Sequence, residues 1–95
     1  MSRHHTQLLR TIFHDPPNGN LHWRDVESLL RHVGAELEPA SGGRLRVHLG
    51  RHEGFLHRPH HGQTLGASAV LHVRELLARG GVTPSQYEAA NRDAG

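Results

Sequence analysis

Several kinds of residue are scarce or missing in this chain of 95 residues. It has no cysteine and no lysine, and tryptophan, tyrosine and phenylalanine together make up only 4% of it. The lack of cysteine excludes disulfide bonds and thiolate chemistry. With 35% hydrophobic residues and so few aromatic ones, the chain predicts one small domain with a thin, mainly aliphatic core. Such a core excludes a large enzyme with a deep pocket.

Long apolar runs are also missing. No stretch approaches the roughly 18 apolar residues that a membrane-spanning helix needs. The first residues include no apolar stretch typical of a secretory signal peptide. We therefore expect a soluble cytoplasmic protein with no membrane partner.

What the chain has instead is arginine and histidine. All 11 basic residues are arginine, nine residues are acidic, and 11 more are histidine, so the formal net charge is +2 with histidine neutral. Because histidine titrates near about pH 6.5, this charge rises in mild acid. The composition is typical of proteins that bind phosphate or nucleic acid. A mutational bias toward Arg, Gly, Ala and Pro would produce it too.

Apolar side chains at helical spacing predict helices on both sides of a strand-rich centre. We expect a first helix within residues 1–14, a second over about 21–33 with Asn20 as its N-cap, a third that ends at Gly80, and a short last helix over 84–88. The apolar sets are Leu8, Leu9, Ile12 and Phe13, then Val26, Leu29, Leu30 and Val33, then Ala69, Val70, Val73, Leu76 and Leu77.

Three strands are predicted between the second and third helices, over residues 35–38, 44–49 and 52–58. The first is a short apolar and acidic segment, the second alternates strictly, and the third ends at Pro59, which cannot donate to a strand ladder. A run of strands with helices before and after it predicts an α+β two-layer sandwich.

One face of this sheet is expected to stay open. Apolar and polar residues alternate along 44–49, so Leu45, Val47 and Leu49 should face the helices. A turn of two or four residues then places the odd-numbered residues of the returning strand on the opposite face. Residues 44–61 include four arginines, five histidines and a single acid, Glu53. The open face is expected to carry Arg44, Arg46, His48, Phe55 and His57, with Arg58, His60 and His61 at its end.

Histidine and arginine on one face are the groups that metal-independent RNA cleavage uses. A neutral histidine takes the proton from a 2′-hydroxyl, a protonated histidine gives one to the leaving oxygen, and arginine stabilises the negative charge on phosphorus. We assign the base to His57 and the acid to His60. Phosphate and RNA contacts are assigned to Arg44, Arg46, His48, Arg58 and His61.

The spacing of His57, His60 and His61 also suits a zinc or nickel site, since imidazole is a ligand for both ions. No aspartate or cysteine lies nearby to complete such a site, and Pro59 stiffens the segment. We therefore expect neither a metal nor a cofactor.

The order of these segments resembles the HicA toxins of bacterial toxin–antitoxin pairs. The segments that carry the resemblance are residues 21–30 with 34–36, the Ser-Gly-Gly-Arg of 41–44, the Phe-Leu-His-Arg-Pro-His-His-Gly of 55–62, and 73–82. They span about 20–83.

The resemblance implies a double-stranded-RNA-binding-like two-layer sandwich, α-β-β-β-α, over 20–83. Residues 1–19 would then be an N-terminal extension with a short helix, and 84–95 a C-terminal tail with a short helix. It further implies an endoribonuclease that acts on mRNA, and a HicB-like antitoxin that covers the active face. The family's catalytic histidine belongs to a Gly-Ser-His motif, and position 44 here is arginine. Because His57 is expected opposite or diagonal to Arg44, we assign it that role.

Two other functions fit the same face. The first is a non-catalytic RNA-binding module of the same fold. The second is an interaction protein that docks an acidic partner on its basic sheet face. Self-association is compatible with all three functions.

Overall fold

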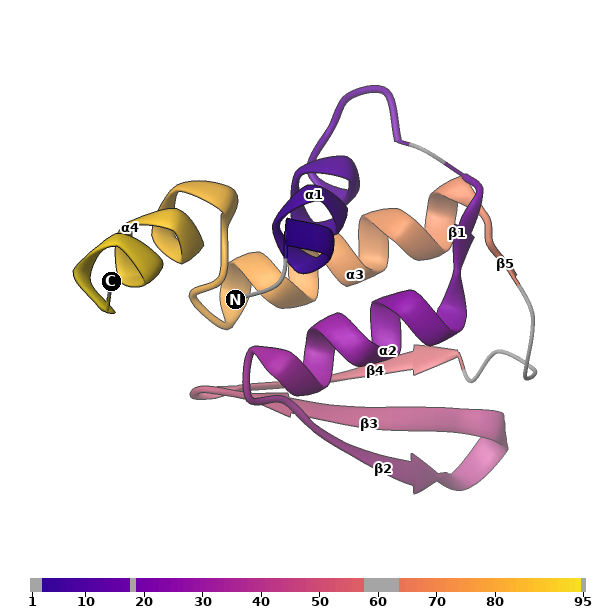
Figure 1. The fold of residues 1–95 in the computed structure, drawn as a ribbon. Coiled ribbons are helices and arrows are strands. Elements are labelled where there is room, and N and C mark those ends of the chain that lie inside the picture. Colours follow the sequence, from indigo (N-terminus) through magenta and orange to yellow (C-terminus); the bar gives the residue numbers. More distant parts are fainter. Residues whose placement is uncertain (1–2, 18, 58–63, 95) are drawn as a thin grey trace.

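The computed structural model describes residues 3–17, 19–57 and 64–94. Within these ranges the chain is an α+β fold, as the sequence predicted, with the helices on one side of a sheet (Figure 1). The elements are α1 (Arg3–Ile12), β1 (Leu21–His22), α2 (Trp23–His32), β2 (Glu36–Ala40), a short 3-10 helix (Ser41–Gly43), β3 (Arg44–Leu49), β4 (His52–His57), β5 (Thr64–Leu65), α3 (Ala67–Arg79) and α4 (Pro84–Ala94).

The main sheet is an antiparallel meander in the order β2-β3-β4. Helices α2 and α3 cover one of its faces, and the described elements leave the other face uncovered (Figure 1). Strand β3 alternates between exposed and buried residues along its whole length, so Leu45, Val47 and Leu49 point into the helical layer. The three predicted strands and the predicted inner face of β3 are confirmed.

A second, two-stranded sheet pairs β1 with β5, and the sequence did not predict it. Leu21 lies opposite Leu65 in this pair. Helix α2 therefore begins at Trp23, with His22 rather than Asn20 in the N-cap position, and His22 makes no side-chain capping bond. The predicted cap was wrong because residues 21 and 22 pair with a distant strand before the helix starts.

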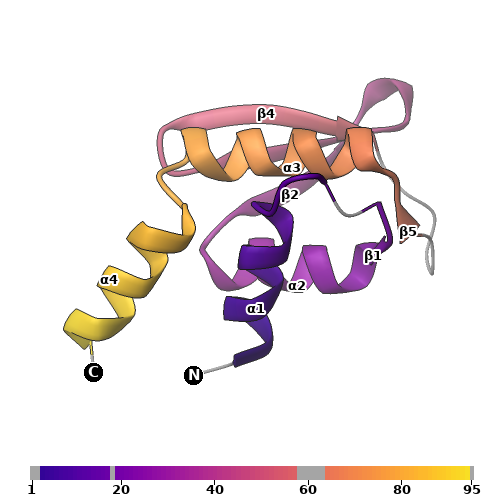
Figure 2. The same ribbon diagram turned by 90° about the horizontal axis from the view of Figure 1, so that it is seen from above.

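The core is aliphatic and is shared by α1, α2, α3 and the inner face of the sheet. Leu9 and Ile12 of α1 are as deeply buried as Leu29 and Leu30 of α2. The N-terminal helix overlies α2 when the molecule is viewed from above, on the side of α2 that faces away from the sheet (Figures 1 and 2). The first helix is therefore packed into the same core as the rest of the described chain, as its predicted apolar stripe requires.

Arg74 of α3 anchors the segment that leaves α1. Its guanidinium donates to the carbonyl oxygens of Ile12 at 2.9 Å and His14 at 2.7 Å, and to the carboxylate of Asp15 at 2.8 Å. Only 19% of the Arg74 side chain is exposed. The bond to Ile12 satisfies a carbonyl that α1 leaves unpaired at its C-terminus, and the other two bonds hold the segment that follows the helix.

Helix α4 is longer than the predicted short helix. It begins at Pro84 after Thr83, whose hydroxyl accepts a hydrogen bond from the backbone N–H of Gln86 at 3.3 Å, as an N-cap does. Glu88 forms an ion pair with Arg10 of α1, and the Tyr87 hydroxyl lies 2.9 Å from Nε2 of His32. Among the described residues, no helix has the length and apolar character needed to cross a membrane.

Candidate nucleic-acid interface

The register of β3 and β4 brings the predicted residues of the open face together. A two-residue turn joins the strands, and Arg44 lies directly opposite His57, while Arg46 lies opposite Phe55. Leu56 is buried and points the other way. The predicted pairing of odd-numbered with even-numbered positions is confirmed, and so is the placement of Arg44 beside His57.

Arg44 is held in a defined orientation. Its guanidinium carbon lies 4.5 Å from the centre of the Phe55 ring, and its Nε donates to the carbonyl oxygen of Ser41 at 3.1 Å. The turn that supplies this carbonyl depends on Gly42 and Gly43, whose φ angles of 74° and 70° lie in the left-handed region that favours glycine. Phe55 is 46% exposed, which is unusual for a large apolar side chain in this fold.

We define the basic end of the open face as Arg44, Phe55 and His57. Among the described residues, no carboxylate lies within ion-pair distance of Arg44. A guanidinium stacked on an aromatic ring keeps its N–H edge available for a phosphate. The basic end therefore combines a fixed cation, an exposed ring and a histidine.

The rest of the open face differs from the sequence expectation, because β2 adds two acids to it. Glu36 lies opposite His48 and Glu38 opposite Arg46. Ion-pair distances are 3.6 Å from Nδ1 of His48 to Glu36 and 3.4 Å from Arg46 to Glu38. The expectation of a face with Glu53 as its single acid was wrong, since it left out what β2 contributes.

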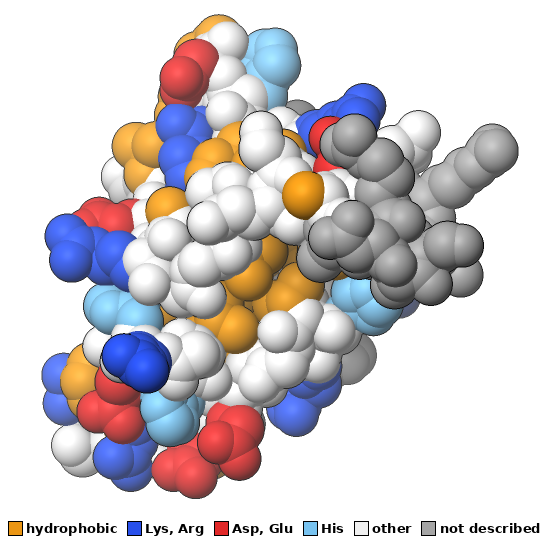
Figure 3. All heavy atoms as spheres, turned by 90° about the vertical axis from the view of Figure 1, so that its left-hand side faces the viewer, with side chains coloured by type: hydrophobic (Ala, Val, Ile, Leu, Met, Phe, Trp, Pro, Cys, Tyr) orange, Lys and Arg blue, Asp and Glu red, His pale blue; other side chains and the backbone are white. Residues whose placement is uncertain are grey.

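These two pairs and Glu53 line a hollow of about 220 Å³, which we call the paired end. Acidic and basic side chains lie side by side along the sheet when the molecule is viewed from the β3–β4 turn (Figure 3). Arg46 and His48, assigned to RNA contacts from the sequence, are therefore engaged by carboxylates. The Glu-x-Glu spacing at positions 36 and 38 was the available signal, since it puts both acids on one face of a strand.

Four of the seven residues assigned to the site from the sequence lie in the described part of the chain, namely Arg44, Arg46, His48 and His57. The other three, Arg58, His60 and His61, lie outside the described residues. No group of three or more metal-ligating side chains gathers in the described part.

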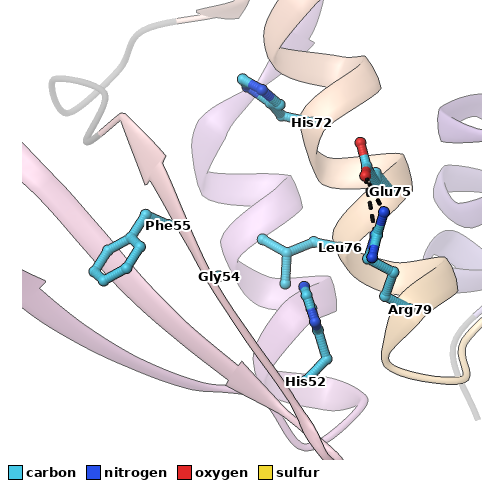
Figure 4. Close-up of a pocket in the computed structure, with 7 residues that line it drawn as sticks. All are labelled: His52, Gly54, Phe55, His72, Glu75, Leu76 and Arg79. Atoms are coloured by element: carbon cyan, nitrogen blue, oxygen red, sulfur yellow. Dashed lines mark hydrogen bonds and ion pairs between the residues drawn. The ribbon is translucent and has the colours of Figure 1, made fainter.

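A groove that the sequence did not predict runs between β4 and α3. It has a volume of about 280 Å³, and its lining includes His52 and Gly54 from the strand and His72, Glu75 and Arg79 from the helix. Arg79 is paired with Glu75 at 2.9 Å (Figure 4). No local pattern signals this groove, because it depends on how α3 lies against the edge of the sheet.

The chain was compared with protein-family models, with curated proteins and with solved structures, and none of the three comparisons found a match. Its function is therefore inferred from the chemistry of the open face.

Proposed function

We propose that the chain binds RNA at the basic end of its open sheet face and cleaves the RNA backbone there without a metal. The observation that carries the proposal is the position of Arg44, which is stacked on exposed Phe55 and lies directly opposite His57. An arginine can bind the phosphodiester, an aromatic ring can stack on a base, and a histidine can accept the proton of a 2′-hydroxyl.

Arg44 is the phosphate contact in this proposal. Its bond to the Ser41 carbonyl and its contact with the Phe55 ring restrict the side chain before any ligand arrives. A preorganised guanidinium loses less rotamer freedom when it binds, and its planar fork matches two phosphate oxygens. Phe55 offers a ring on which an unpaired base of single-stranded RNA would stack.

The reaction uses the nucleophile that RNA itself carries. Neutral His57 accepts the proton of a 2′-hydroxyl, whose oxygen attacks the adjacent phosphorus, and Arg44 stabilises the charge that develops on the phosphoryl oxygens. The bond to the 5′-oxygen breaks, and that oxygen takes a proton from a second histidine. The sequence assigns this second proton transfer to His60, and the products are a 2′,3′-cyclic phosphate and a 5′-hydroxyl.

The order of elements supports a HicA-like assignment. Helix α2, the β2-β3-β4 meander and α3 follow one another in the α-β-β-β-α order of a double-stranded-RNA-binding-like sandwich, and both helices cover the same face. In this proposal mRNA is the substrate and a HicB-like antitoxin covers the basic end. The paired end limits the basic surface that either partner meets, since Glu38 lies within ion-pair distance of Arg46 and Glu36 within that distance of His48.

The test is an RNA cleavage assay in EDTA with the wild-type chain, His57→Ala, His60→Ala and a control, His14→Ala. We expect the wild type and the control to cleave equally, and each of the other variants to lose about a hundredfold or more in rate, as the loss of a general base or acid does. Cleavage that is the same in His57→Ala and the wild type would refute the assignment and point to a contaminating nuclease.

A non-catalytic RNA-binding module is the second candidate. The observation that favours it is that Arg44 stacked on the exposed ring of Phe55 offers a phosphate contact and a stacking platform, and neither of these needs a proton transfer. Retention of RNA with no cleavage by the wild type would select it. Docking of an acidic protein is disfavoured at the paired end, where Glu36, Glu38 and Glu53 would repel such a partner.

A further inference from the structure

The outer edge of β4 is a strand edge with backbone groups left to pair. Strand β4 ends the sheet order, and in the described part of the chain no strand pairs with its outer side. The two-residue turn before it has Gly50 at φ 61°, the conformation of a II′ hairpin. In such a hairpin the residues that flank the turn exchange both backbone hydrogen bonds, and bonded and non-bonded pairs then alternate. Glu53, Phe55 and His57 consequently direct their backbone N–H and C=O groups outward.

The opposite edge of the sheet, formed by β2, is protected. The same alternation turns the backbone nitrogen of Pro39 outward, because its neighbours Glu38 and Ala40 face Arg46 and Arg44. Proline has no N–H to offer an incoming strand, and glutamates on an edge strand repel one another across a new pair. Strand β4 has no proline among its six residues, and it carries one glutamate, Glu53, where β2 carries two.

We propose that two copies of this chain associate edge to edge through β4, in antiparallel orientation about Phe55. This register places Glu53 opposite the partner's His57, twice by symmetry, and Phe55 opposite the partner's Phe55. A carboxylate accepts a hydrogen bond from the N–H of a facing imidazole, and aromatic rings in directly facing positions also stabilise a strand pair. The self-complementarity of Glu53, Phe55 and His57 is what selects a second copy as the occupant of this edge.

The surroundings of the edge leave room for a strand. The groove of about 280 Å³ between β4 and α3 follows this edge, and Gly54 contributes no side chain to it. In the close-up, His52 and Leu76 lie on the helix side of β4, while Phe55 lies on the other side (Figure 4). The partner's strand would continue the sheet, and the two open faces would form one surface with a basic end from each copy.

Sedimentation of the full-length chain over a range of concentrations tests the association without RNA, so the result does not depend on the proposed ribonuclease. We expect the mass to approach twice that of one chain. At pH 6, Glu53→Arg should weaken the dimer about tenfold, because two attractive pairs become repulsive, and adding His57→Glu to it should restore the dimer. Glu36→Arg makes the same charge change at the β2 edge and should have no effect. A wild type that stays monomeric, or equal effects of the two arginine variants, would overturn the proposal.

Amide hydrogen exchange tests the register itself and needs no variant. In the monomer the outward amides of Glu53, Phe55 and His57 exchange fast, whereas those of Gly54 and Leu56 are protected by β3. We expect the outward amides to become protected as the concentration rises through the dimer range. Fast exchange at these positions in a dimer would overturn the proposal and place the interface elsewhere.

Discussion

The guanidinium of Arg44 lies over the ring of Phe55, with 4.5 Å between its central carbon and the ring centre. The two residues stand on neighbouring strands and are diagonal to one another, since Arg44 is opposite His57 and Phe55 is opposite Arg46. The contact holds a cation in place on a surface where Arg46 is engaged by Glu38. It therefore distinguishes Arg44 from an ordinary solvent-exposed arginine.

The first prediction concerns this stacked arginine. Arg44→Ala should weaken binding of single-stranded RNA about tenfold at low salt. The fall of log K with log salt should also become less steep, by about one unit of slope. Arg44→Lys should recover part of the affinity, because it keeps the charge and loses the planar stack. Fluorescence anisotropy titrations measure both effects. Arg51→Ala, which removes the same charge from the β3–β4 turn, is the control, and an equal loss there would mean non-specific attraction.

A second prediction follows from the carboxylate beside Arg46. Glu38→Gln should raise RNA affinity about twofold to threefold at low salt, because it releases Arg46 from an exposed pair of modest strength. The gain should disappear at high salt, where exposed charges are screened. Glu27→Gln is a matched control, since Glu27 pairs with Arg31 within α2. Unchanged affinity in Glu38→Gln would show that Arg46 does not contact RNA.

The third prediction concerns the anchor between α3 and the segment after α1. Arg74→Met should lower the free energy of unfolding by about 2–4 kcal/mol, because it removes three hydrogen bonds and leaves carbonyl oxygens unpaired. Arg79→Met removes only an exposed pair within α3 and should cost about 0.5 kcal/mol or less. Urea denaturation followed by circular dichroism measures both. Equal effects would contradict the anchoring role.

The fourth prediction concerns the stacked rings of His5 and His32, whose centres lie 4.3 Å apart. Burial first, then the neighbouring charges of His32 and His4, hold the pKa of His5 below its usual 6.5. The unfolded chain therefore binds a proton at His5 more readily than the folded chain does. Stability from this site is complete above about pH 6.5 and falls as the pH drops through the lowered pKa.

His5→Gln should accordingly flatten the decline of unfolding free energy between about pH 7 and pH 5. His14→Gln removes an exposed histidine outside the stack, and it should leave the decline as it is in the wild type. Urea denaturation at a series of pH values supplies the comparison. Parallel curves for the wild type and His5→Gln would contradict this account.

The sequence was most informative where structure is set by local pattern. Alternation along β3 predicted that Leu45, Val47 and Leu49 all face inward. A short turn of two or four residues then places His57 beside Arg44 on the other face. The stripe of Leu8, Leu9 and Ile12 predicted a helix in the same way, although it did not show where that helix packs.

What the sequence did not reveal depends on pairs of distant segments. Strands β1 and β5 have two residues each and carry no periodic signal, so only their pairing makes them strands. The acids of β2 were read as a short strand without a register, and their contact with Arg46 and His48 was missed for that reason. The HicA-like function and the roles of His57 and His60 remain predictions.

Pro39 limits how far the sheet can grow. A molecule with two receptive edges would add copies at both and extend into a fibre, as open head-to-tail contacts do. Here the backbone of Pro39 turns outward on the β2 edge and has no N–H to donate to an incoming strand, and pairing through β4 in the proposed register would use the other edge. A dimer formed in this way would leave two β2 edges free, so the proposed contact joins two molecules and does not by itself extend into a fibre.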